Sequence, residues 1–336
     1  MIAAHRIGGG DKLEGDVAGE GQDGNPEFLW WNGEQRRWAE ATVHVTDLGW
    51  STVGAVFEGI RGYWNEDAGE LYVFRLHEHL ERLMRSMKLV RLPIDYSVEA
   101  LTDAILELLR DNGCREDTYI RPLAYAANAS GKRLSNVGNE ASLLVNTRPM
   151  ASHLLTGHTE TAKVSSWRRI SDEVMPTRIK NLSNYRNGQL ASMEARQDGY
   201  DTALLLNHGG TVAEAPGACV MIVRDGVLVT PGVTDSILES ITRDALIRLS
   251  REALGLEVVE RTLDRTELYL ADEVFLCGTA AEITPIVGID KYDIGTAATG
   301  PVTRELERVF HGVLRGREDR YAAWRTAVGV AVPVGA

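Results

Sequence analysis

Residues 175–185 read Met-Pro-Thr-Arg-Ile-Lys-Asn-Leu-Ser-Asn-Tyr, and they place Lys180 between an irregular stretch and a helix-compatible run. Pro176 disfavours a regular element before the lysine, whereas the run after it continues through Ala191 and Ala195. A lysine in a loop between a strand and a helix can project into a cleft, where its amine can form a Schiff base with a carbonyl cofactor. A solvated surface lysine is the ordinary alternative, so other parts of the sequence have to decide.

The composition is that of a globular protein acting on small molecules. A length of 336 residues favours two domains, and 44% hydrophobic with 25% charged residues is ordinary for a folded chain. No stretch approaches the roughly 18 continuous apolar residues of a membrane span. The net charge of -12, with Lys and Arg scattered among acids, argues against a nucleic-acid partner.

Three cysteines, Cys114, Cys219 and Cys277, are widely spaced and form no Cys-x-x-Cys pair. This pattern predicts neither a metal site nor a redox couple, and it favours a reducing, cytoplasmic compartment. The first residues lack the basic and apolar regions of a signal peptide and are rich in Gly, Asp and Glu. We therefore expect residues 1–26 to form a mobile arm.

Strand-like and helix-like segments follow one another without a regular βαβ alternation. Ser97 and Ser240 are predicted N-caps of two helices, and residues 42–45, 118–125, 141–146 and 273–277 are predicted strands. Residues 200–230 alternate short β-rich runs with turns, which predicts an antiparallel meander. The pattern favours an α+β protein with a small domain over residues 27–147, a connection over 148–159 and a large domain over 160–336.

The lysine segment resembles the cofactor-lysine motif of class IV aminotransferases, with Lys180, Asn184 and Tyr185 forming its Lys-x-x-x-Asn-Tyr pattern. Further segments resemble branched-chain amino acid aminotransferases in the same order: residues 56–61 (Val-Phe-Glu-Gly-Ile-Arg), 74–83 (Phe-Arg-Leu-His-Glu-His-Leu-Glu-Arg-Leu), 119–123 (Tyr-Ile-Arg-Pro-Leu), 241–244 (Ile-Thr-Arg-Asp) and 278–285 (Gly-Thr-Ala-Ala-Glu-Ile-Thr-Pro). This resemblance implies a two-domain class IV fold with a pyridoxal 5'-phosphate site in the inter-domain cleft.

The resemblance gives the motif residues roles in pyridoxal-phosphate chemistry. Lys180 would hold the cofactor covalently and then move a proton as general base and acid. Glu214 resembles the carboxylate that pairs with the pyridine nitrogen and keeps it protonated. Tyr185 would share a proton with the cofactor's 3′-oxygen. Without the motif, Glu214 would read as an exposed turn acid and Tyr185 as a half-buried helix residue.

The cofactor phosphate needs positive charge and free amide groups, and four residues could supply them. Ile241 and Thr242 follow Ser240 at a predicted helix start, where N–H groups and the helix dipole favour an anion. Thr279 adds a hydroxyl after the predicted strand 273–277, and Arg82 adds a charge-assisted contact. Arg82 would otherwise be a solvated helix residue, and the resemblance favours the phosphate role.

Residues of the first domain are predicted to bind the substrate. Tyr119 and Arg121 occupy positions i and i+2 of one predicted strand, so they share a face. In branched-chain enzymes the corresponding pair lines the substrate pocket, and the arginine helps to accept the side-chain carboxylate of glutamate. The same family places the substrate α-carboxylate at the turn that here contains Thr279 and Ala280.

Phe57 and Arg61 are also predicted to line the substrate pocket, although Phe57 fits a core position equally well. Three departures from the family pattern leave the substrate open. Thr52 and Val53 stand where the family has a tyrosine and a glycine, and Cys219 replaces a polar residue. The family's Tyr-Leu-Gly segment is not found between residues 141 and 158.

The resemblance implies a homodimer that transfers amino groups between a branched-chain amino acid and 2-oxoglutarate by a reversible ping-pong mechanism. Arg121 favours this interpretation. The missing tyrosines favour an (R)-amine or D-amino acid aminotransferase of the same fold, and a lyase is a further alternative. A non-catalytic cofactor-binding protein is the alternative from another class, and intact Lys180, Tyr185 and Glu214 argue against it.

Overall fold

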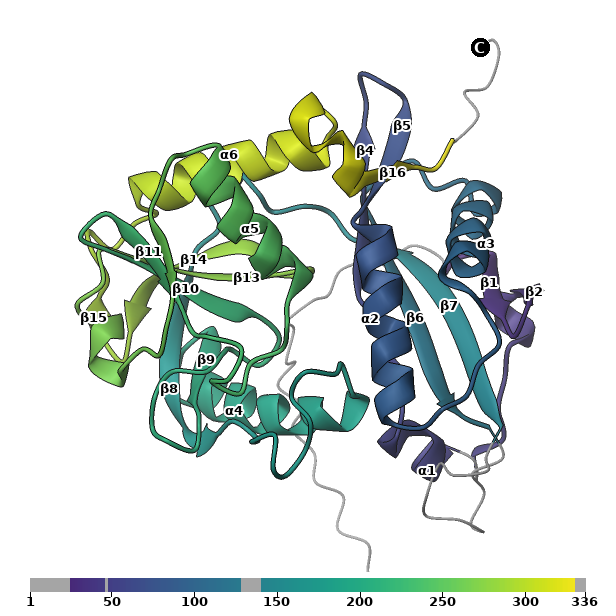
Figure 1. Ribbon diagram of the computed structural model, residues 1–336, viewed down its shortest axis with the longest axis horizontal. Helices are drawn as coiled ribbons and strands as arrows, with labels where there is room; N and C mark the ends of the chain where they lie inside the picture. The colour runs from purple at the N-terminus through teal and green to yellow at the C-terminus, as the bar shows by residue number, and fades with distance from the viewer. Residues whose placement is uncertain (1–24, 46–47, 128–139, 330–336) are drawn as a thin grey trace, which may run out of the picture.

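The computed structural model describes residues 25–45, 48–127 and 140–329, whose strands form two eight-stranded sheets. The two sheets and their helices lie side by side in Figure 1. Residues 1–24, which make up most of the expected mobile arm, lie outside the described residues. In the described part of the chain, no helix is long and apolar enough to cross a membrane.

The first sheet is antiparallel and has the strand order β16-β5-β4-β6-β7-β1-β2, with β3 paired to β6. Its strands are β1 (Phe28–Trp31), β2 (Glu34–Arg37), β3 (Val56–Phe57), β4 (Ile60–Asn65), β5 (Glu70–Phe74), β6 (Thr118–Ala126), β7 (Ala141–Pro149) and β16 (Arg325–Ala327). Helices α1 (Leu48–Val53), α2 (Leu76–Leu89) and α3 (Val98–Asp111) accompany it, with the 3-10 helix η1 (Trp38–Glu40).

Helices α2 and α3 bury their apolar faces in one core with the first sheet, because their leucines recur at helical spacing. The predicted cap of α3 is confirmed, since the Ser97 hydroxyl accepts a hydrogen bond from the Ala100 amide at 3.1 Å. Ile179, next to Lys180, packs into this same core. The lysine segment is therefore anchored on the first sheet although it follows a strand of the second.

The second sheet is mixed and has the order β12-β11-β10-β13-β14-β8-β9, with β15 paired to β14. Its strands are β8 (Glu160–Arg168), β9 (Thr202–Leu206), β10 (Cys219–Arg224), β11 (Val227–Thr230), β12 (Val258–Glu260), β13 (Glu273–Gly278), β14 (Glu282–Ile289) and β15 (Tyr292–Asp293). The helices are α4 (Tyr185–Gln197), α5 (Ile241–Glu252) and α6 (Pro301–Leu314), with 3-10 helices η3 (Leu182–Asn184), η4 (Arg265–Leu268) and η5 (Asp319–Trp324).

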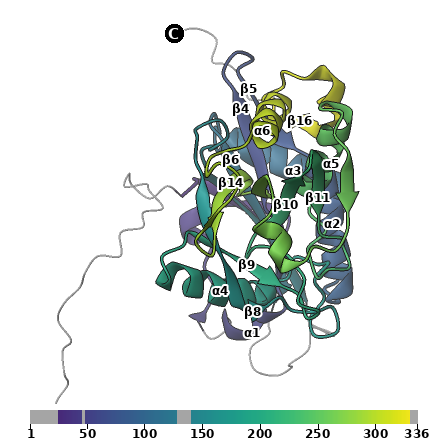
Figure 2. The ribbon, with the colours of Figure 1, turned by 90° about the vertical axis from the view of Figure 1, so that its left-hand side faces the viewer.

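Helices α5 and α6 share a core with β10, β13 and β14, whereas α4 packs on β9 through alanines. The predicted cap of α5 is confirmed, because the Ser240 hydroxyl accepts from the Arg243 amide at 3.2 Å. Figures 1 and 2 place α1 and α4 at one end of the molecule and α6 at the other. The α+β architecture predicted from the sequence is confirmed.

One local prediction is wrong, and another holds only in part. Residues 42–45 form no strand, and Val43 and Val45 are exposed, so their apolar alternation has no core to face. Strand β9 pairs parallel with β8, because α4 returns the chain to the same end of the sheet, so the meander predicted over residues 200–230 is limited to the antiparallel pair β10–β11. Strand β16, which lies within the domain expected over residues 160–336, pairs with β5 of the first sheet. The domain boundaries stay a prediction.

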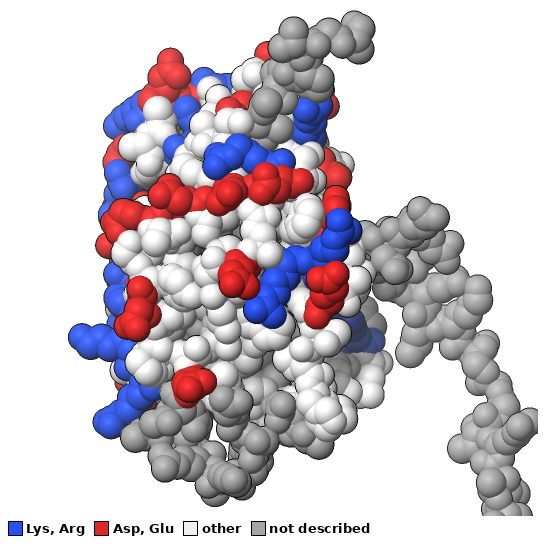
Figure 3. Space-filling view, turned by 90° about the vertical axis from the view of Figure 1, so that its right-hand side faces the viewer, with Lys and Arg blue, Asp and Glu red and all other residues white. Residues whose placement is uncertain are grey.

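The surface of the first sheet and its helices carries mixed charge. On the face seen in Figure 3, Lys and Arg alternate with Asp and Glu around a broad uncharged area. The basic residues on this face do not gather into a continuous patch of the kind that binds a phosphate backbone.

Candidate active site

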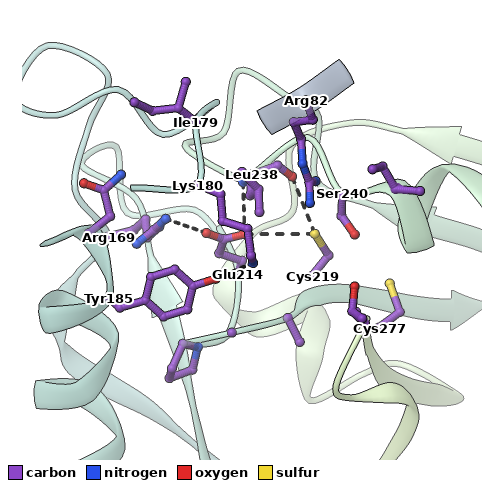
Figure 4. Close-up of a pocket in the computed structure, with 17 residues that line it drawn as sticks. Arg82, Arg169, Ile179, Lys180, Tyr185, Glu214, Cys219, Leu238, Ser240 and Cys277 are labelled. Atoms are coloured by element: carbon purple, nitrogen blue, oxygen red, sulfur yellow. Dashed lines mark hydrogen bonds and ion pairs between the residues drawn. The ribbon is translucent and has the colours of Figure 1, made fainter. Parts of the chain in front are cut away.

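The Lys180 segment lies at the junction of the two sheets, between β8 and α4. The Lys180 backbone carbonyl accepts a hydrogen bond from the Phe57 amide at 3.0 Å, and the Leu182 amide donates to the Ala55 carbonyl at 2.8 Å. The side chain of Asn184 donates to the Pro176 carbonyl at 3.0 Å and thereby closes the irregular stretch on itself. These bonds hold the segment against β3 and direct the lysine side chain into a pocket (Figure 4).

Lys180 is surrounded by aromatic groups. Its amine donates to the Tyr185 hydroxyl at 2.5 Å and lies 4.9 Å from the centre of the Phe57 ring. Burial lowers the pKa of the Lys180 amine, but the neighbouring Tyr185 and Glu58 more than offset this, so the pKa is raised. The pair can hold and exchange one proton, and the predicted role of Tyr185 at the cofactor's 3′-oxygen stays a prediction.

Glu214 reaches the same pocket from the turn between β9 and β10. Its carboxylate is 5% exposed, forms an ion pair with Arg169 at 2.7 Å and accepts from the Leu238 amide at 3.1 Å. Burial raises the pKa of Glu214, and the charge of Arg169 opposes this shift. Helix α4 packs closely against the turn that carries Glu214. Glycine is needed at position 188 of this helix, because a side chain there would overlap the backbone of Pro216.

Arg169 was not predicted from the sequence. It lies just past the end of β8, 45 positions before Glu214, and no motif or period marks it. Its guanidinium also donates to the Ser236 carbonyl at 3.4 Å, which ties it to the loop before α5. Arg169 orients the Glu214 carboxylate, and no signal in this single sequence would have identified it.

The opposite end of the pocket is suited to an anion. Arg82, Ser240, Ile241 and Thr279 line it together, and Ser240 caps the start of α5, where N–H groups are free to bind a ligand. Thr242 is buried in the first turn of α5 and does not line the pocket. Most of the predicted phosphate residues are therefore close together, although they come from distant parts of the sequence.

Arg82 is held by a buried carboxylate that sequence reasoning did not assign. Glu58 accepts two hydrogen bonds from Arg82, each 2.7 Å, and a third contact from His79 Nδ1 at 2.8 Å. Burial alone would raise the pKa of Glu58, but the charges and hydrogen bonds of Arg82 and His79 together outweigh it and lower the pKa to about 2. Arg82 also donates to the Glu239 carbonyl at 2.6 Å, beside the start of α5.

Of the predicted substrate residues, Thr279 lines this pocket, whereas Phe57, Arg61, Tyr119, Arg121 and Ala280 do not. Phe57 packs against Tyr185 with ring centres 5.0 Å apart, so it lies beside the lysine. The Tyr119 hydroxyl fills the space at Gly59, where a side chain would overlap it. Arg121 is exposed and donates to Asn146 across 3.3 Å.

Arg61 does not line this pocket, and its place at the substrate stays a prediction. It is 1% exposed, lies 3.1 Å from a carboxylate oxygen of Glu282 and donates to the Met150 carbonyl at 2.5 Å. A buried guanidinium requires such a partner, so the ion pair holds Arg61 away from the pocket lining. Ala280 is exposed in the turn after Thr279 and does not line the pocket either.

The positions that depart from the family pattern have local explanations. The Thr52 hydroxyl donates to the Leu48 carbonyl within α1, and Val53 is exposed at the end of that helix. The Cys219 thiol lies 4.0 Å from Glu214 and 3.7 Å from the Leu238 carbonyl. Burial, followed by the charge of Glu214, raises the pKa of Cys219 to about 12, so the thiol adds no charge to the site.

The described residues include no group of three His, Cys, Asp or Glu side chains that could hold a metal ion. The pocket itself brings together the Lys180 amine, the buried Glu214 carboxylate and an end suited to an anion. This combination of a two-sheet α+β fold and a lysine at the junction of the sheets is that of an enzyme that binds a phosphorylated carbonyl cofactor.

Comparison with known proteins identifies the family. The model of the amino-transferase class IV family matches residues 55–289. The branched-chain-amino-acid aminotransferase of Escherichia coli (strain K12) is 38% identical over 301 residues, which cover 89% of this chain and 96% of that protein. The chain belongs to the class IV aminotransferases, and its cofactor is pyridoxal phosphate.

Solved structures agree with the fold. The branched-chain amino acid aminotransferase from Thermobaculum terrenum in its pyridoxal-phosphate form is 52% identical, with a TM-score of 0.87 over 91% of this chain and 99% of that one. The branched-chain aminotransferase from Thermoproteus uzoniensis with norvaline is 40% identical, with a TM-score of 0.84 over 90% and 99%. The predicted two-domain class IV fold is confirmed.

The residues present fit pyridoxal phosphate. The Lys180 amine could bond to its aldehyde, and the Glu214 carboxylate could pair with its ring nitrogen. Arg82 and Thr279 could bind its phosphate. The Asn184 Oδ1 atom is buried at the pocket wall and has no hydrogen-bond partner among the described residues. A buried acceptor of this kind is satisfied when a ligand or its water fills the pocket.

Proposed function

We propose that this chain transfers amino groups between a branched-chain or related amino acid and 2-oxoglutarate by a ping-pong mechanism. The observation that carries the proposal is the placement of the Lys180 amine and the Glu214 carboxylate in one pocket whose other end suits a phosphate. The branched-chain aminotransferases that resemble this chain over about nine-tenths of its length support the substrate class.

Pyridoxal phosphate, when bound, supplies a carbonyl that combines with amines and a ring that withdraws electrons from the neighbouring carbon. Lys180 would hold it and then act at Nζ as general base and acid. The Tyr185 hydroxyl, 2.5 Å from that amine, would tune its proton affinity. The ion pair with Arg169 would keep the Glu214 carboxylate directed at the ring nitrogen.

The substrate is proposed to lie between Lys180 and the exposed face of β6. Phe57 beside the lysine would contact an apolar side chain, and Tyr119 would bound the same space. Arg121 is free to turn toward a carboxylate, since its guanidinium is exposed. A single site could then accept leucine and 2-oxoglutarate in turn.

A second candidate is an (R)-amine or D-amino acid aminotransferase. It is favoured by the α1 helix, where Thr52 binds its own helix backbone at the position at which the family has a tyrosine. Loss of an aromatic wall enlarges the space available to a substrate, because each aromatic side chain covers roughly 150 to 250 Å². The two candidates share all of the cofactor chemistry and differ only in the donor.

We also propose a cytoplasmic homodimer. Exposed apolar side chains concentrate in the segment that ends with α1, which contacts η3 beside the lysine segment: Trp38, Val43, Val45, Leu48 and Val53. A patch of this kind is typical of a protein interface. The described cysteines Cys114, Cys219 and Cys277 are all free thiols, as expected in a reducing compartment.

The test of the activity is a set of half-reactions with purified, cofactor-loaded protein. L-leucine and L-valine should change the cofactor absorbance, and 2-oxoglutarate should restore it. A response to D-alanine or an (R)-amine, without a response to L-leucine, would select the second candidate. Cofactor absorbance that stays constant with every donor would reject both. Light scattering of the same sample should give twice the mass of one chain.

A further inference from the structure

The hairpin turn that presents Thr279 is closed by an unusual residue. Gly278 pairs with Glu282 across β13 and β14, so residues 279–281 form the turn. Glu282 has a φ of 44°, in the left-handed region that glycine adopts with less strain. The position nevertheless carries a glutamate whose side chain is fully buried. The side chain must therefore make contacts that offset the backbone strain and the burial of a charge.

The Glu282 carboxylate contacts two other parts of the chain, the connection between the sheets and strand β4. It accepts from the Ser152 hydroxyl at 2.8 Å and from the His153 amide at 2.9 Å, both in the connection between the sheets. Arg61 of β4 approaches it to 3.1 Å. A buried carboxylate is stable only with such partners, so Glu282 links the hairpin of the second sheet to a strand of the first.

The turn itself is held from the same side. The Ala281 carbonyl accepts from the Thr284 hydroxyl at 2.8 Å and from His153 Nε2 at 3.0 Å. Residue 153 therefore contacts both Ala281 and Glu282, the last residue of the turn and the residue that closes it. Because of these contacts, a displacement of His153 in the connection would also displace the turn that contains Thr279.

The connection is in turn fixed on the first sheet. Arg61 donates to the Met150 carbonyl at 2.5 Å, and the Ser152 amide donates to Asp117 at 3.1 Å. Asp117 also binds Arg315 through two hydrogen bonds of 2.5 and 2.6 Å. Residues 150–153 thus lie between the half-buried Asp117–Arg315 ion pair and the buried Arg61–Glu282 pair, and the second pair includes the residue that closes the Thr279 hairpin.

We infer that Glu282 is a positioning residue for cofactor binding, which holds the 279–281 turn at the depth where Thr279 meets the phosphate. Arg61 and the connection supply the fixed points from the first sheet. The affinity for the phosphate therefore depends on how the two sheets are joined. This inference rests on the proposed function, in which Thr279 contacts the cofactor phosphate.

The experiment compares two ligands that differ only in the phosphate. Full-length protein is stripped of cofactor and titrated with pyridoxal phosphate and, separately, with pyridoxal. In Glu282→Gln and Glu282→Gly, the dissociation constant for pyridoxal phosphate should rise about tenfold, the scale of one charged hydrogen bond, while that for pyridoxal changes less than about twofold. Glycine adopts the positive φ of position 282 with less strain than glutamine. Comparison of Glu282→Gly with Glu282→Gln therefore separates the loss of the carboxylate from the effect of backbone strain.

Equal weakening of both ligands, or no weakening of either, would overturn the inference. If a single variant does not fold, Arg61→Met/Glu282→Gly serves instead, because it leaves no unpaired buried charge. Glu267→Gln is the control: it breaks the ion pair of 2.7 Å with Arg261, which lies outside the connection and the Thr279 hairpin, and should leave the ratio of the two affinities unchanged. Thr279→Ala should reproduce the selective loss, and its failure to do so would count against the proposed phosphate site itself.

Discussion

The pocket has two sides that differ in how firmly their side chains are held. On the cofactor side, Arg82 and Glu214 are each 5% exposed, and both are fixed by ion pairs and hydrogen bonds to neighbouring chain. On the substrate side, Arg121 of β6 is exposed and its guanidinium makes a long bond of 3.3 Å to Asn146. The cofactor side is complete in one chain, and the substrate side is open.

This difference follows from the cost of burying charge. A buried ion needs several partners, so the side chains of the cofactor side have one arrangement before any ligand arrives. An exposed arginine needs none, because water solvates it, and it can change its position with the ligand. Substitutions at the cofactor side are therefore expected to lower the rate of transamination strongly. Substitutions at the substrate side should instead alter which substrates are accepted.

The largest effect is expected at Lys180. Lys180→Ala removes the amine that holds the cofactor and moves the proton, so steady transamination should be abolished while the fold remains. Turnover of L-leucine and thermal unfolding, measured together, separate these outcomes. Lys163→Ala is the control, because Lys163 lies on β8 and pairs with Glu194 at 3.3 Å, away from the pocket lining. Steady turnover by cofactor-loaded Lys180→Ala would contradict the assignment.

Glu214→Gln should slow proton transfer by roughly 10²- to 10³-fold, because the neutral amide no longer stabilises charge on the ring nitrogen. Cofactor affinity should change much less, since the anion end of the pocket is intact. Single-turnover absorbance kinetics with L-leucine measure the first quantity and equilibrium titration the second. Rates equal to those of the parent would mean that another residue faces the nitrogen.

The buried pair at Arg82 predicts acid sensitivity. The pKa of Glu58 is about 2 in the folded protein and about 4.5 when unpaired, so its stabilisation is present above pH 4.5 and lost between pH 4.5 and 2. A shift of this size corresponds to about 3 kcal/mol. Glu58→Gln should lose about that much free energy of unfolding at pH 7 and show a flatter acid limb.

Urea unfolding of cofactor-free protein at pH 7, 5 and 3.5 measures this prediction. Glu305→Gln is the control, because Glu305 pairs with Arg308 on the surface of α6. Its unfolding curves should superimpose on those of the parent. If Glu58→Gln also matched the parent at pH 7, the cofactor side would be less firmly held than the comparison implies.

The smallest and most selective effect is expected at Arg121. A charge-assisted contact to a carboxylate contributes roughly 1.5 to 3 kcal/mol, so Arg121→Ala should lower the efficiency of the 2-oxoglutarate half-reaction by roughly 10- to 150-fold. The leucine half-reaction should change much less. An equal loss with both substrates would mean that Arg121 is structural or binds the shared α-carboxylate.

The sequence alone located the parts of the site that depend on local chemistry. Lys180 and Tyr185 are five residues apart, and their contact follows from the loop and helix that contain them. The Ser97 and Ser240 caps act over three residues, so they too were predictable. Glu214 was identified by the resemblance of its turn, which reads Gly-Thr-Val-Ala-Glu-Ala-Pro-Gly over residues 210–217, to that of the family. Each of these features is encoded within about ten consecutive residues.

Only the tertiary structure decided the partners of the buried charges. Arg169 and Glu214 are 45 residues apart, and Arg61 and Glu282 are 221 apart. No period or motif links such pairs, so Arg169 was missed and Arg61 was assigned to the substrate pocket. The same holds for β16, which pairs with β5 across most of the chain. A short segment specifies its own backbone and caps, but a buried charge is satisfied by whichever partner the packing of the two sheets brings to it.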